Sequence, residues 1–393
     1  MRGLSADKTD FVPDFSGIFL LKEVCMYHEK FMAAAIKLAK KGIGFVNPNP
    51  MVGAVIVRNG EIIGQGYHSK CGELHAERNA FADCDSRGID CAGADMYATL
   101  EPCCHYGKTP PCTEAIIEHK IKRVFIGSSD PNPLVAGKGA AILREMGIEV
   151  TEGILKEECD SLNEIFFHYI TKKTPFVTMK YAMTMDGKIA CFTGKSQWIT
   201  GEAARENVHL DRLKHMGIMV GIGTVLADNP MLTCRIEGGK NPVRIICDTN
   251  LRTPLDSNIV RTAGEIPTII ACSKGDTAAF EAAGCQIVRV PEKDGHIDLN
   301  ELMIILGRDF KIDSILLEGG GELNWSALKS GIVCKVQTYI APKIFGGKTA
   351  PTAVSGTGAA SPDECVMLYD RQIKTIGGDI LIESRVKNVH GDN

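Results

Sequence analysis

The chain has 393 residues, of which 44% are apolar and 23% charged, and its formal net charge is −4. These values are ordinary for a soluble globular protein and, at roughly 150 residues per domain, indicate two or three domains. The acidic balance argues against a nucleic-acid-binding protein, because such proteins need a basic face that neutralises phosphates. No apolar run is long enough to cross a bilayer, so we do not expect a membrane protein.

Cysteine usage bears on the compartment. The 15 cysteines are an odd number and are spread along the whole chain, whereas a secreted disulfide scaffold is short and usually pairs its cysteines evenly. We therefore expect a cytoplasmic protein with reduced thiols. Most of them should be small buried side chains, and a few should be recruited to a metal.

The first 25 residues have an unusual pattern. An acidic stretch with Asp7, Asp10 and Asp14 precedes a short apolar run over residues 17–21, whereas a signal peptide begins with a basic region and ends at a small-residue cleavage site. We expect residues 1–25 to be an extension that is either disordered or the product of a start assigned too early, with Met26 as the true start.

In the first half of the chain, predicted helices alternate with predicted strands. Apolar side chains at helical spacing predict a helix over 28–41, and further helices are expected at 75–81, 112–119 and 139–146. Strands are expected at 52–57, 61–64, 95–100, 123–127 and 148–150, the first two joined by an Asn59-Gly60 hairpin turn. The pattern predicts an α/β domain over 26–172 that ends with a helix between about 160 and 174.

The second half reads as another α/β domain, over 175–385. Strands are predicted at 176–182, 218–221, 243–247, 267–271, 287–290, 314–318 and 336–341, with helices between them. The strand at 314–318 leads into Gly319-Gly-Gly321 and then a helix, an arrangement that favours an anion such as a dinucleotide phosphate. The dinucleotide fingerprint G-x-G-x-x-G is absent.

One constellation in the first half predicts a metal site. His75, Cys103 and Cys112 offer one imidazole and two thiolates, which leaves the fourth tetrahedral position of a single zinc ion for water, as in catalytic sites. Glu77 stands two residues past the histidine and can reach that water without binding the metal, so it is the candidate proton carrier. The alternatives are a closed structural zinc site or no metal, but a closed site would not require Glu77. Cys104 is a competing thiol that we expect to point away.

The segment from Thr99 to Cys112, which reads Thr-Leu-Glu-Pro-Cys-Cys-His-Tyr-Gly-Lys-Thr-Pro-Pro-Cys, resembles the deaminase half of the bifunctional riboflavin-biosynthesis deaminase/reductases. Residues 47–57 and 66–68 resemble the same half, and residues 180–188, 196–200, 223–230 and 232–235 resemble the reductase half. The resemblance runs from Met26 to about Glu383. It implies a cytidine-deaminase-like three-layer domain with a mixed sheet, followed by a dihydrofolate-reductase-like α/β domain.

The resemblance implies that zinc hydroxide deaminates a diaminopyrimidinone bearing a phosphoribosylamino group. NADPH then reduces the ribosyl group to ribityl. In the deaminase, Asn47, His68, His105 and Lys108 are implied to line the substrate pocket. Asn47 could hydrogen-bond a pyrimidine edge and Lys108 could contact phosphate. Asn47 could equally serve a turn before Pro48, and Lys108 could be solvated.

For the reductase, the resemblance implies two groups of residues. The cofactor group is Ala182, Trp198, Thr200, Thr224, Asp228, Thr249, Gly320, Gly321, Glu322, Leu323, Asn324, Trp325 and Ser326. The substrate group is Ser196, Arg212, Leu232, Arg235 and Glu318. The Trp198 indole could cover a nicotinamide or could simply pack in the core. Lys180 and Asp186 are further polar groups near the expected site, without an assigned role.

Three departures from the family pattern stand near these sites. Cys71-Gly-Glu-Leu74 replaces a stiffer segment before His75, Lys195 stands where glutamate is usual, and Met216 stands where aspartate is usual. The last two motivate a second hypothesis, a deaminase with a catalytically impaired reductase-like domain. A nucleic-acid-editing deaminase and a zinc scaffold without catalysis are two further hypotheses. We expect a small-molecule pyrimidine ribotide as substrate, no nucleic-acid or membrane partner, and a homo-oligomer.

Overall fold

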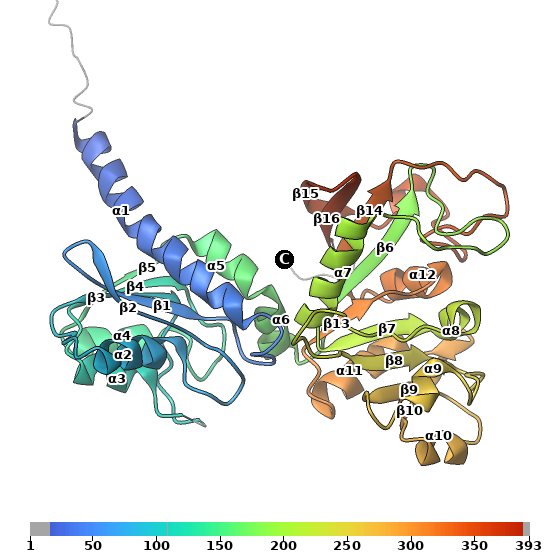
Figure 1. The fold of residues 1–393 in the computed structure, drawn as a ribbon, viewed down its shortest axis with the longest axis horizontal. Helices are drawn as coiled ribbons and strands as arrows, with labels where there is room; N and C mark the ends of the chain where they lie inside the picture. Colours follow the sequence, from blue (N-terminus) through green and yellow to red (C-terminus); the bar gives the residue numbers. More distant parts are fainter. Residues whose placement is uncertain (1–15, 108, 388–393) are drawn as a thin grey trace, which may run out of the picture. The chain divides into compact units, whose positions relative to one another are not determined.

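The computed structural model describes residues 16–107 and 109–387, and these form two compact units. One unit contains residues 51–162 with the described residues up to 42, and the other contains 43–50 and 163–387. Each is an α/β fold, which confirms the predicted class (Figure 1). In the described part of the chain, no helix is both long and apolar enough to span a membrane. The expectations for residues 1–15 and Lys108 lie outside the described residues.

The first unit is built on a five-stranded mixed sheet in the order β2-β1-β3-β4-β5. β1 runs antiparallel to β2 and β3, and β3, β4 and β5 are parallel. Asn59 and Gly60 both have positive φ, as the predicted hairpin turn requires. The strands are β1 (Gly53–Arg58), β2 (Glu61–Tyr67), β3 (Asp95–Leu100), β4 (Arg123–Ser128) and β5 (Glu149–Glu152).

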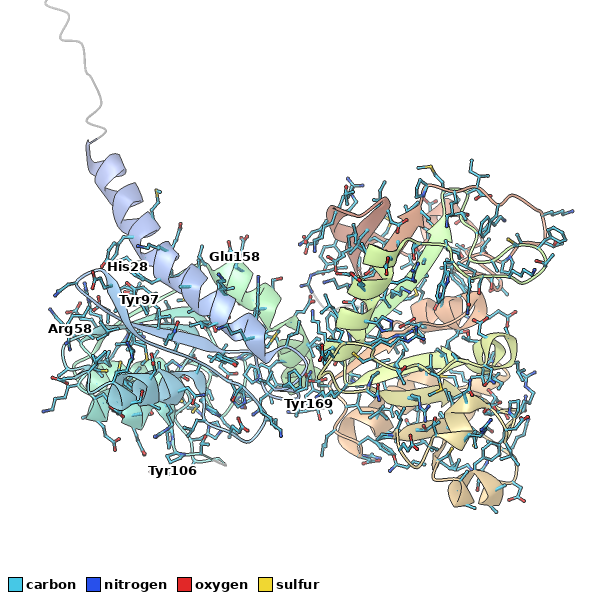
Figure 2. All side chains as sticks on the ribbon, viewed as in Figure 1. His28, Arg58, Tyr97, Tyr106, Glu158 and Tyr169 are labelled. Carbon is cyan, nitrogen blue, oxygen red and sulfur yellow. The ribbon has the colours of Figure 1, made fainter. Side chains whose placement is uncertain are left out.

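Helices cover both faces of this sheet, which gives the expected three layers (Figure 1). One face carries α1 (Ser16–Ala39), which leads into a short 3-10 turn (Lys40–Gly42), and α5 (Lys156–Leu162). The other carries α2 (Ala76–Ser86), α3 (Cys112–Glu118) and α4 (Lys138–Glu145). Where α1 packs on the sheet, its His28 Nδ1 lies 2.8 Å from the hydroxyl of Tyr97 in β3 (Figure 2).

α1 starts earlier than the helix that the sequence predicts over 28–41. It begins at Ser16, so it includes residues 16–25 of the segment that we expected to be an extension. The physical reason is that no proline interrupts residues 16–39, and the apolar run at 17–21 is therefore continuous with the helix.

The second unit contains a nine-stranded sheet in the order β10-β9-β8-β7-β13-β6-β14-β16-β15. In this order the first seven strands, which end with β14, are parallel to one another. β16 then pairs antiparallel with β14, and β15 pairs antiparallel with β16 at the edge of the sheet. The strands are β6 (Phe176–Thr184), β7 (Gly217–Gly221), β8 (Val243–Cys247), β9 (Thr268–Cys272), β10 (Gln286–Arg289), β13 (Ser314–Leu317), β14 (Val333–Ala341), β15 (Leu368–Ile376) and β16 (Asp379–Val386). A separate hairpin pairs β11 (Glu292–Lys293) with β12 (His296–Ile297).

Helices on the two faces of this sheet pack against its strands around buried apolar clusters. The helices are α6 (Glu164–Lys172), α7 (Glu202–Lys214), α8 (Ile222–Asp228), α9 (Asn258–Arg261), α10 (Ala278–Ala282), α11 (Leu299–Arg308) and α12 (Gly321–Lys329), with a 3-10 turn at Pro362–Glu364. The carboxyl ends of the parallel strands β6, β13, β7 and β8 meet at one edge of the sheet, which is where ligands bind in open parallel sheets.

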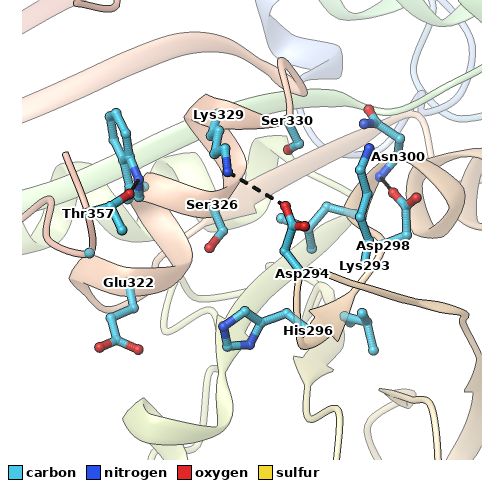
Figure 3. A pocket seen from close by; sticks show the side chains of 14 residues that line it. Lys293, Asp294, His296, Asp298, Asn300, Glu322, Ser326, Lys329, Ser330 and Thr357 are labelled. Atoms are coloured by element: carbon cyan, nitrogen blue, oxygen red, sulfur yellow. Dashed lines mark hydrogen bonds and ion pairs between the residues drawn. The ribbon is translucent and has the colours of Figure 1, made fainter. Parts of the chain in front are cut away.

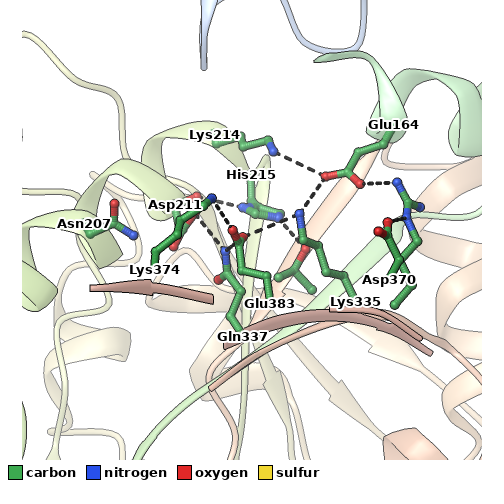
Figure 4. Close-up of polar contacts among 12 residues, drawn as sticks. Glu164, Asn207, Asp211, Lys214, His215, Lys335, Gln337, Asp370, Lys374 and Glu383 are labelled. Carbon is green, nitrogen blue, oxygen red and sulfur yellow. Dashed lines mark hydrogen bonds and ion pairs between the residues drawn. The ribbon is translucent and has the colours of Figure 1, made fainter. Parts of the chain in front are cut away.

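An ion-pair network attaches α6 to the second unit. The buried Glu164 carboxylate accepts hydrogen bonds from Lys335 at 3.1 Å and Arg385 at 2.9 Å and lies 3.6 Å from Lys214 (Figure 4). Although burial alone raises the pKa of Glu164, these three cations lower it overall. The sequence pattern predicted that the first domain ends with this helix. In the structure, the polar contacts of Glu164 in α6 are with residues of the second unit.

Candidate active sites

The predicted metal ligands come together at the amino ends of two helices in the first unit. His75 is the residue before α2, Cys112 is the first residue of α3, and Cys103 follows β3. The potential ligand atoms of these three residues all lie within 4.8 Å of one another. Cys104 is not in this cluster, and its thiol instead donates to the Leu134 carbonyl at 3.7 Å.

The spacing of the three ligand atoms fits tetrahedral zinc. His75 Nδ1 lies 3.4 Å from Cys103 Sγ and 3.5 Å from Cys112 Sγ. Zinc–sulfur and zinc–nitrogen bonds of about 2.3 and 2.05 Å at a tetrahedral angle separate nitrogen from sulfur by about 3.6 Å. The donor set of one imidazole and two thiols therefore suits zinc and leaves one position for water.

Local hydrogen bonds favour a thiolate at Cys103. Its pKa is lowered to about 4, chiefly because the Cys112 thiol donates to its sulfur, and the Cys112 backbone N–H also donates at 3.3 Å. Only the thiolate binds metal, so the segment that carries Cys112 prepares Cys103 as a ligand.

Glu77 lies in the first turn of α2 beside this cluster and is only 3% exposed. Burial is the main cause that raises its pKa, and the neighbouring Cys103 sulfur raises it further. A carboxyl group whose pKa is moved toward neutrality can both accept and return a proton, as a general acid–base residue must.

Neighbouring residues that the sequence reasoning missed hold the ligands in place. Arg78 donates from Nε to the Pro110 carbonyl at 3.0 Å and from Nη2 to the Pro111 carbonyl at 2.7 Å, which fixes the segment before Cys112. A Cβ at Gly66 would lie 2.4 Å from the carbonyl oxygen of Ala76, so only glycine lets β2 approach the start of α2. Arg78 directly follows the His75-Ala76-Glu77 motif, and this position next to the motif is the feature of the sequence that could have indicated its role.

Glu101 is another missed residue of the deaminase unit. It is buried and accepts from the backbone N–H groups of Gly137 at 2.9 Å and Ala140 at 3.1 Å, so it satisfies donors at the amino end of α4. It stands immediately before Pro102 and Cys103, and this link to α4 therefore steadies the cysteine segment.

One of the residues implied for the deaminase substrate packs against the cluster, and another follows the ligand Cys103 by two residues. The His68 ring packs edge-on to His75 with ring centroids 5.3 Å apart, and its Nδ1 lies 3.1 Å from the Leu74 carbonyl. Burial lowers the pKa of His68, which favours the neutral ring. His105 carries a buried Nδ1 without a hydrogen-bond partner among the described residues, so it has a polar group to offer a ligand. The Asn47 amide donates to Asp313 at 2.8 Å within the second unit.

A cavity of about 640 Å³ lies at the carboxyl ends of β13, β7 and β8 in the second unit. Its volume is in the range of small-molecule and cofactor sites. Eight of the thirteen residues implied for the cofactor line it, as does Ser196 from the substrate group. The eight are Thr224, Asp228, Thr249, Gly320, Gly321, Glu322, Leu323 and Ser326.

The amino end of α12 suits a dinucleotide phosphate. The first residues of this helix, Gly320 to Leu323, line the cavity, and its capping position is Gly320, which has no side chain to accept from the first backbone N–H groups. A Cβ on Gly321 would lie 2.6 Å from Ser355 Oγ and 2.7 Å from the Thr352 carbonyl oxygen, so the close approach of the neighbouring segment requires glycine. The cavity and this helix end therefore fit NADPH.

Five of the implied cofactor residues do not line this cavity. Asn324 is buried and donates to the Ala353 carbonyl at 2.8 Å, and Trp325 Nε1 donates to Thr357 at 3.2 Å. Trp198 is 57% exposed, which argues against simple core packing, and the Arg205 guanidinium lies 4.7 Å from its ring centroid. The remaining two are Ala182 and Thr200.

Three charged residues of the reductase unit form one cluster. Arg212 in α7 forms a two-pronged contact with Glu318, at 2.7 and 3.0 Å, and Lys180 in β6 lies 3.8 Å from the same carboxylate. Burial raises the pKa of Glu318, but Arg212 and Lys180 outweigh it and hold that pKa at about 2. Both Arg212 and Glu318 were assigned to the substrate, and Lys180 joins them.

The remaining expected substrate residues and two of the departures from the family pattern, Lys195 and Met216, lie in the second unit. Leu232 is buried, and Arg235 is exposed and acts electrostatically on His209 beside Arg212. The Asp186 carboxylate accepts from the Phe345 and Gly346 backbone at 3.1 and 2.7 Å, so it anchors a loop. Lys195 is exposed and Met216 packs against the apolar core. Neither of these two departures lines the cavity.

Fold and sites together define a two-domain enzyme, with a zinc-dependent deaminase unit followed by a reductase unit. Residues 26–128 match the cytidine and deoxycytidylate deaminase zinc-binding region, and residues 175–382 match the RibD C-terminal domain. The riboflavin biosynthesis protein RibD of Actinobacillus pleuropneumoniae is 55% identical, over 90% of this chain and 94% of that protein. RibD of Bacillus amyloliquefaciens is 44% identical, over 92% of this chain and 96% of that protein.

A solved structure agrees with these matches. The diaminohydroxyphosphoribosylaminopyrimidine deaminase/5-amino-6-(5-phosphoribosylamino)uracil reductase of Thermotoga maritima superposes with a TM-score of 0.81 at 38% identity, covering 93% of this chain and 100% of that one. The chain belongs to the RibD family. It is a bifunctional enzyme of riboflavin biosynthesis that combines a zinc-dependent deaminase with an NADPH-dependent reductase, and an impaired reductase is not favoured.

Proposed function

We propose that the first unit deaminates a diaminopyrimidinone carrying a phosphoribosylamino group, and that the second reduces the ribosyl group of the product to ribityl. The name of the Thermotoga maritima relative specifies a diaminohydroxyphosphoribosylaminopyrimidine deaminase and a 5-amino-6-(5-phosphoribosylamino)uracil reductase, which supports both substrates. The observation that carries the proposal is the pairing of two sites on one chain. These are a three-ligand metal cluster beside a buried Glu77, and a cofactor-sized cavity in the unit that also holds the Arg212–Glu318 pair.

In the deaminase unit, His75, Cys103 and Cys112 would hold zinc. When bound, zinc supplies a Lewis acid that makes water nucleophilic near neutral pH. Glu77 takes the proton from the attacking water and returns it to the departing amine, so ammonia leaves and a ring carbonyl remains. His68 and His105 bind the pyrimidine. We also propose Asn47 and Lys108 as substrate contacts, on the family resemblance.

In the reductase unit, the glycines at the start of α12 would hold the pyrophosphate of NADPH. When bound, NADPH supplies a hydride. Arg212 and Lys180 provide the positive charge that binds the substrate phosphate, and Glu318 holds both cations in position until the substrate arrives. Ser196, Leu232 and Arg235 complete the substrate site in this proposal, and Ala182, Trp198, Thr200, Asn324 and Trp325 complete the cofactor site.

We further propose that the protein acts in the cytoplasm as a homo-oligomer. The cysteines of the described residues are free thiols, which supports a reducing compartment. β15 is an edge strand whose residues are exposed along almost its whole length, including Leu368, Tyr369 and Ile373. An exposed edge strand of this length that carries apolar side chains can pair with a second chain, so a second copy is the proposed partner.

A substrate comparison tests the proposed function. The zinc-loaded chain is given the diaminopyrimidinone ribotide, cytidine or single-stranded RNA, and ammonia release is measured. NADPH oxidation is then followed with the deaminated ribotide. We expect ammonia only from the ribotide, and NADPH oxidation that requires the deaminated product. Ammonia from cytidine or RNA at a comparable rate would contradict the substrate, and no NADPH oxidation would contradict the second step.

A further inference from the structure

The reductase cavity has a marked charge distribution. Among the described residues that line it, Arg252 and His296 are the only basic side chains, whereas Asp228 and Glu322 are acidic. Arg252 is exposed and forms no hydrogen bond or ion pair with any other described residue. A ligand as anionic as a phosphorylated dinucleotide therefore finds one uncommitted guanidinium in this wall.

The segment that carries Arg252 is held in a fixed turn. The buried Asp248 carboxylate follows β8 and accepts from the Thr253 backbone N–H at 2.7 Å and from its hydroxyl at 2.8 Å, so it closes the turn around Arg252. Thr249 Oγ1 accepts from the Ile297 N–H at 3.1 Å, which ties this turn to the β11–β12 hairpin that carries His296. The turn is thus organised before a ligand binds.

Strand order places this turn away from the reacting end. The Arg212–Glu318–Lys180 cluster and the start of α12 lie near the ends of β6 and β13, and β8 is two strands beyond β13. At about 4.8 Å per strand, that separation is about 10 Å. A dinucleotide whose pyrophosphate rests on the start of α12 therefore extends its adenosine toward Thr249, Arg252 and His296.

Resting on the proposed function, we propose that Arg252 binds the 2′-phosphate of NADPH and so selects NADPH over NADH. A phosphate monoester carries about −1.5 to −2 charges near neutral pH, and a guanidinium binds it with two parallel hydrogen bonds. NADH presents a neutral hydroxyl at the same place. The Thr249 hydroxyl accepts one bond and keeps its own hydrogen, so it can donate to the same phosphate.

A neighbouring cavity of about 480 Å³ is the competing location (Figure 3). Its lysines are Lys293 and Lys329, but Asp294, Asp298 and Glu322 line the same space. Lys329 also lies 3.6 Å from Asp294. Lys329 is therefore already paired with a carboxylate, whereas Arg252 has no such partner among the described residues, so Arg252 is the better site.

Direct binding tests the assignment. Adenosine 2′,5′-bisphosphate and 5′-AMP are titrated by calorimetry into the zinc-loaded full chain and into Arg252→Gln, Lys329→Gln and Arg261→Gln. Arg261 is the matched control, because it is an exposed arginine of the same unit outside both cavities. Thermal melting confirms that each variant folds. We expect Arg252→Gln to weaken the bisphosphate about 10- to 100-fold, the range of a lost charged hydrogen bond. The affinity of every variant for 5′-AMP should stay within about twofold of the wild-type value. The affinity of Lys329→Gln and Arg261→Gln for the bisphosphate should stay in the same range.

The outcomes separate this inference from the proposed function. If Arg252→Gln binds the bisphosphate as wild type does, or if Lys329→Gln alone loses it, the assignment of Arg252 is wrong while NADPH reduction stands. If the wild-type chain binds neither the bisphosphate nor NADPH, the reductase function is overturned together with the assignment. As a second readout, the ratio of NADPH to NADH affinity should fall only in Arg252→Gln.

Discussion

The two sites of this chain are assembled in different ways. The deaminase ligands His75, Cys103 and Cys112 lie within 38 residues and are set at the starts of two helices by contacts such as Arg78 to Pro110 and Pro111. The reductase cluster draws Lys180, Arg212 and Glu318 from three distant elements and pairs two cations with one carboxylate. The first site is therefore a local motif, whereas the second exists only when the nine-stranded sheet has formed.

Replacing Glu77 should cause the largest loss of activity, and the loss should be confined to the deaminase. Glu77→Gln keeps the shape of the side chain but cannot carry the proton, so we expect deamination to fall by at least about 10²–10⁴-fold. Zinc content by atomic absorption and NADPH oxidation with the deaminated substrate should be unchanged. Retained deamination would show that another group moves the proton.

The ion-pair cluster predicts an acid sensitivity of the reductase unit. The pKa of Glu318 is held at about 2, below its ordinary value of 4.5, so its contribution to stability is complete above about pH 4.5 and is lost as the pH falls through about 2. A shift of this size corresponds to about 3 kcal/mol. Unfolding monitored against pH should show this loss in the wild-type chain. The Glu318→Gln variant should lack that part of the pH dependence, and an identical pH profile would contradict the account.

Arg78 tests whether the deaminase site depends on its local supports. Arg78→Met removes both hydrogen bonds to the proline segment before Cys112, so we expect zinc affinity to fall about 10-fold, as for other residues that orient metal ligands. Arg87→Met, at the C-cap of the same helix, is the control, since Arg87 contacts Asp83 and Ile63 and not the cysteine segment. Competition with a zinc-binding dye measures both, and equal affinities would remove Arg78 from the site.

The smallest expected effect on either activity concerns β15. Ile373→Lys places a charge on the exposed edge strand, so we expect the particle mass by light scattering to fall toward that of one chain while zinc content stays the same. Unchanged mass would mean that any assembly uses another surface.

The comparison also explains what the sequence could predict. The metal cluster, the α/β class and the hairpin at Asn59-Gly60 follow from local spacing and turn chemistry, and the structure confirms them. β15 was missed because its mixed apolar and charged residues have no buried face, so they lack the alternation that marks a strand. The meeting of Lys180 with Glu318, and the position of Arg252 at the cavity, depend on strand order, which no local pattern contains.

One measurement tests the central claim, that two chemically linked sites act in sequence on one chain. The zinc-loaded protein is incubated with the diaminopyrimidinone ribotide and NADPH, and the product is identified by mass. We predict exchange of one amine for an oxo group together with a gain of two hydrogens. Glu77→Gln should yield no such product unless the deaminated ribotide is supplied. A wild-type product with only one of the two changes, when both zinc and NADPH are present, would contradict this account.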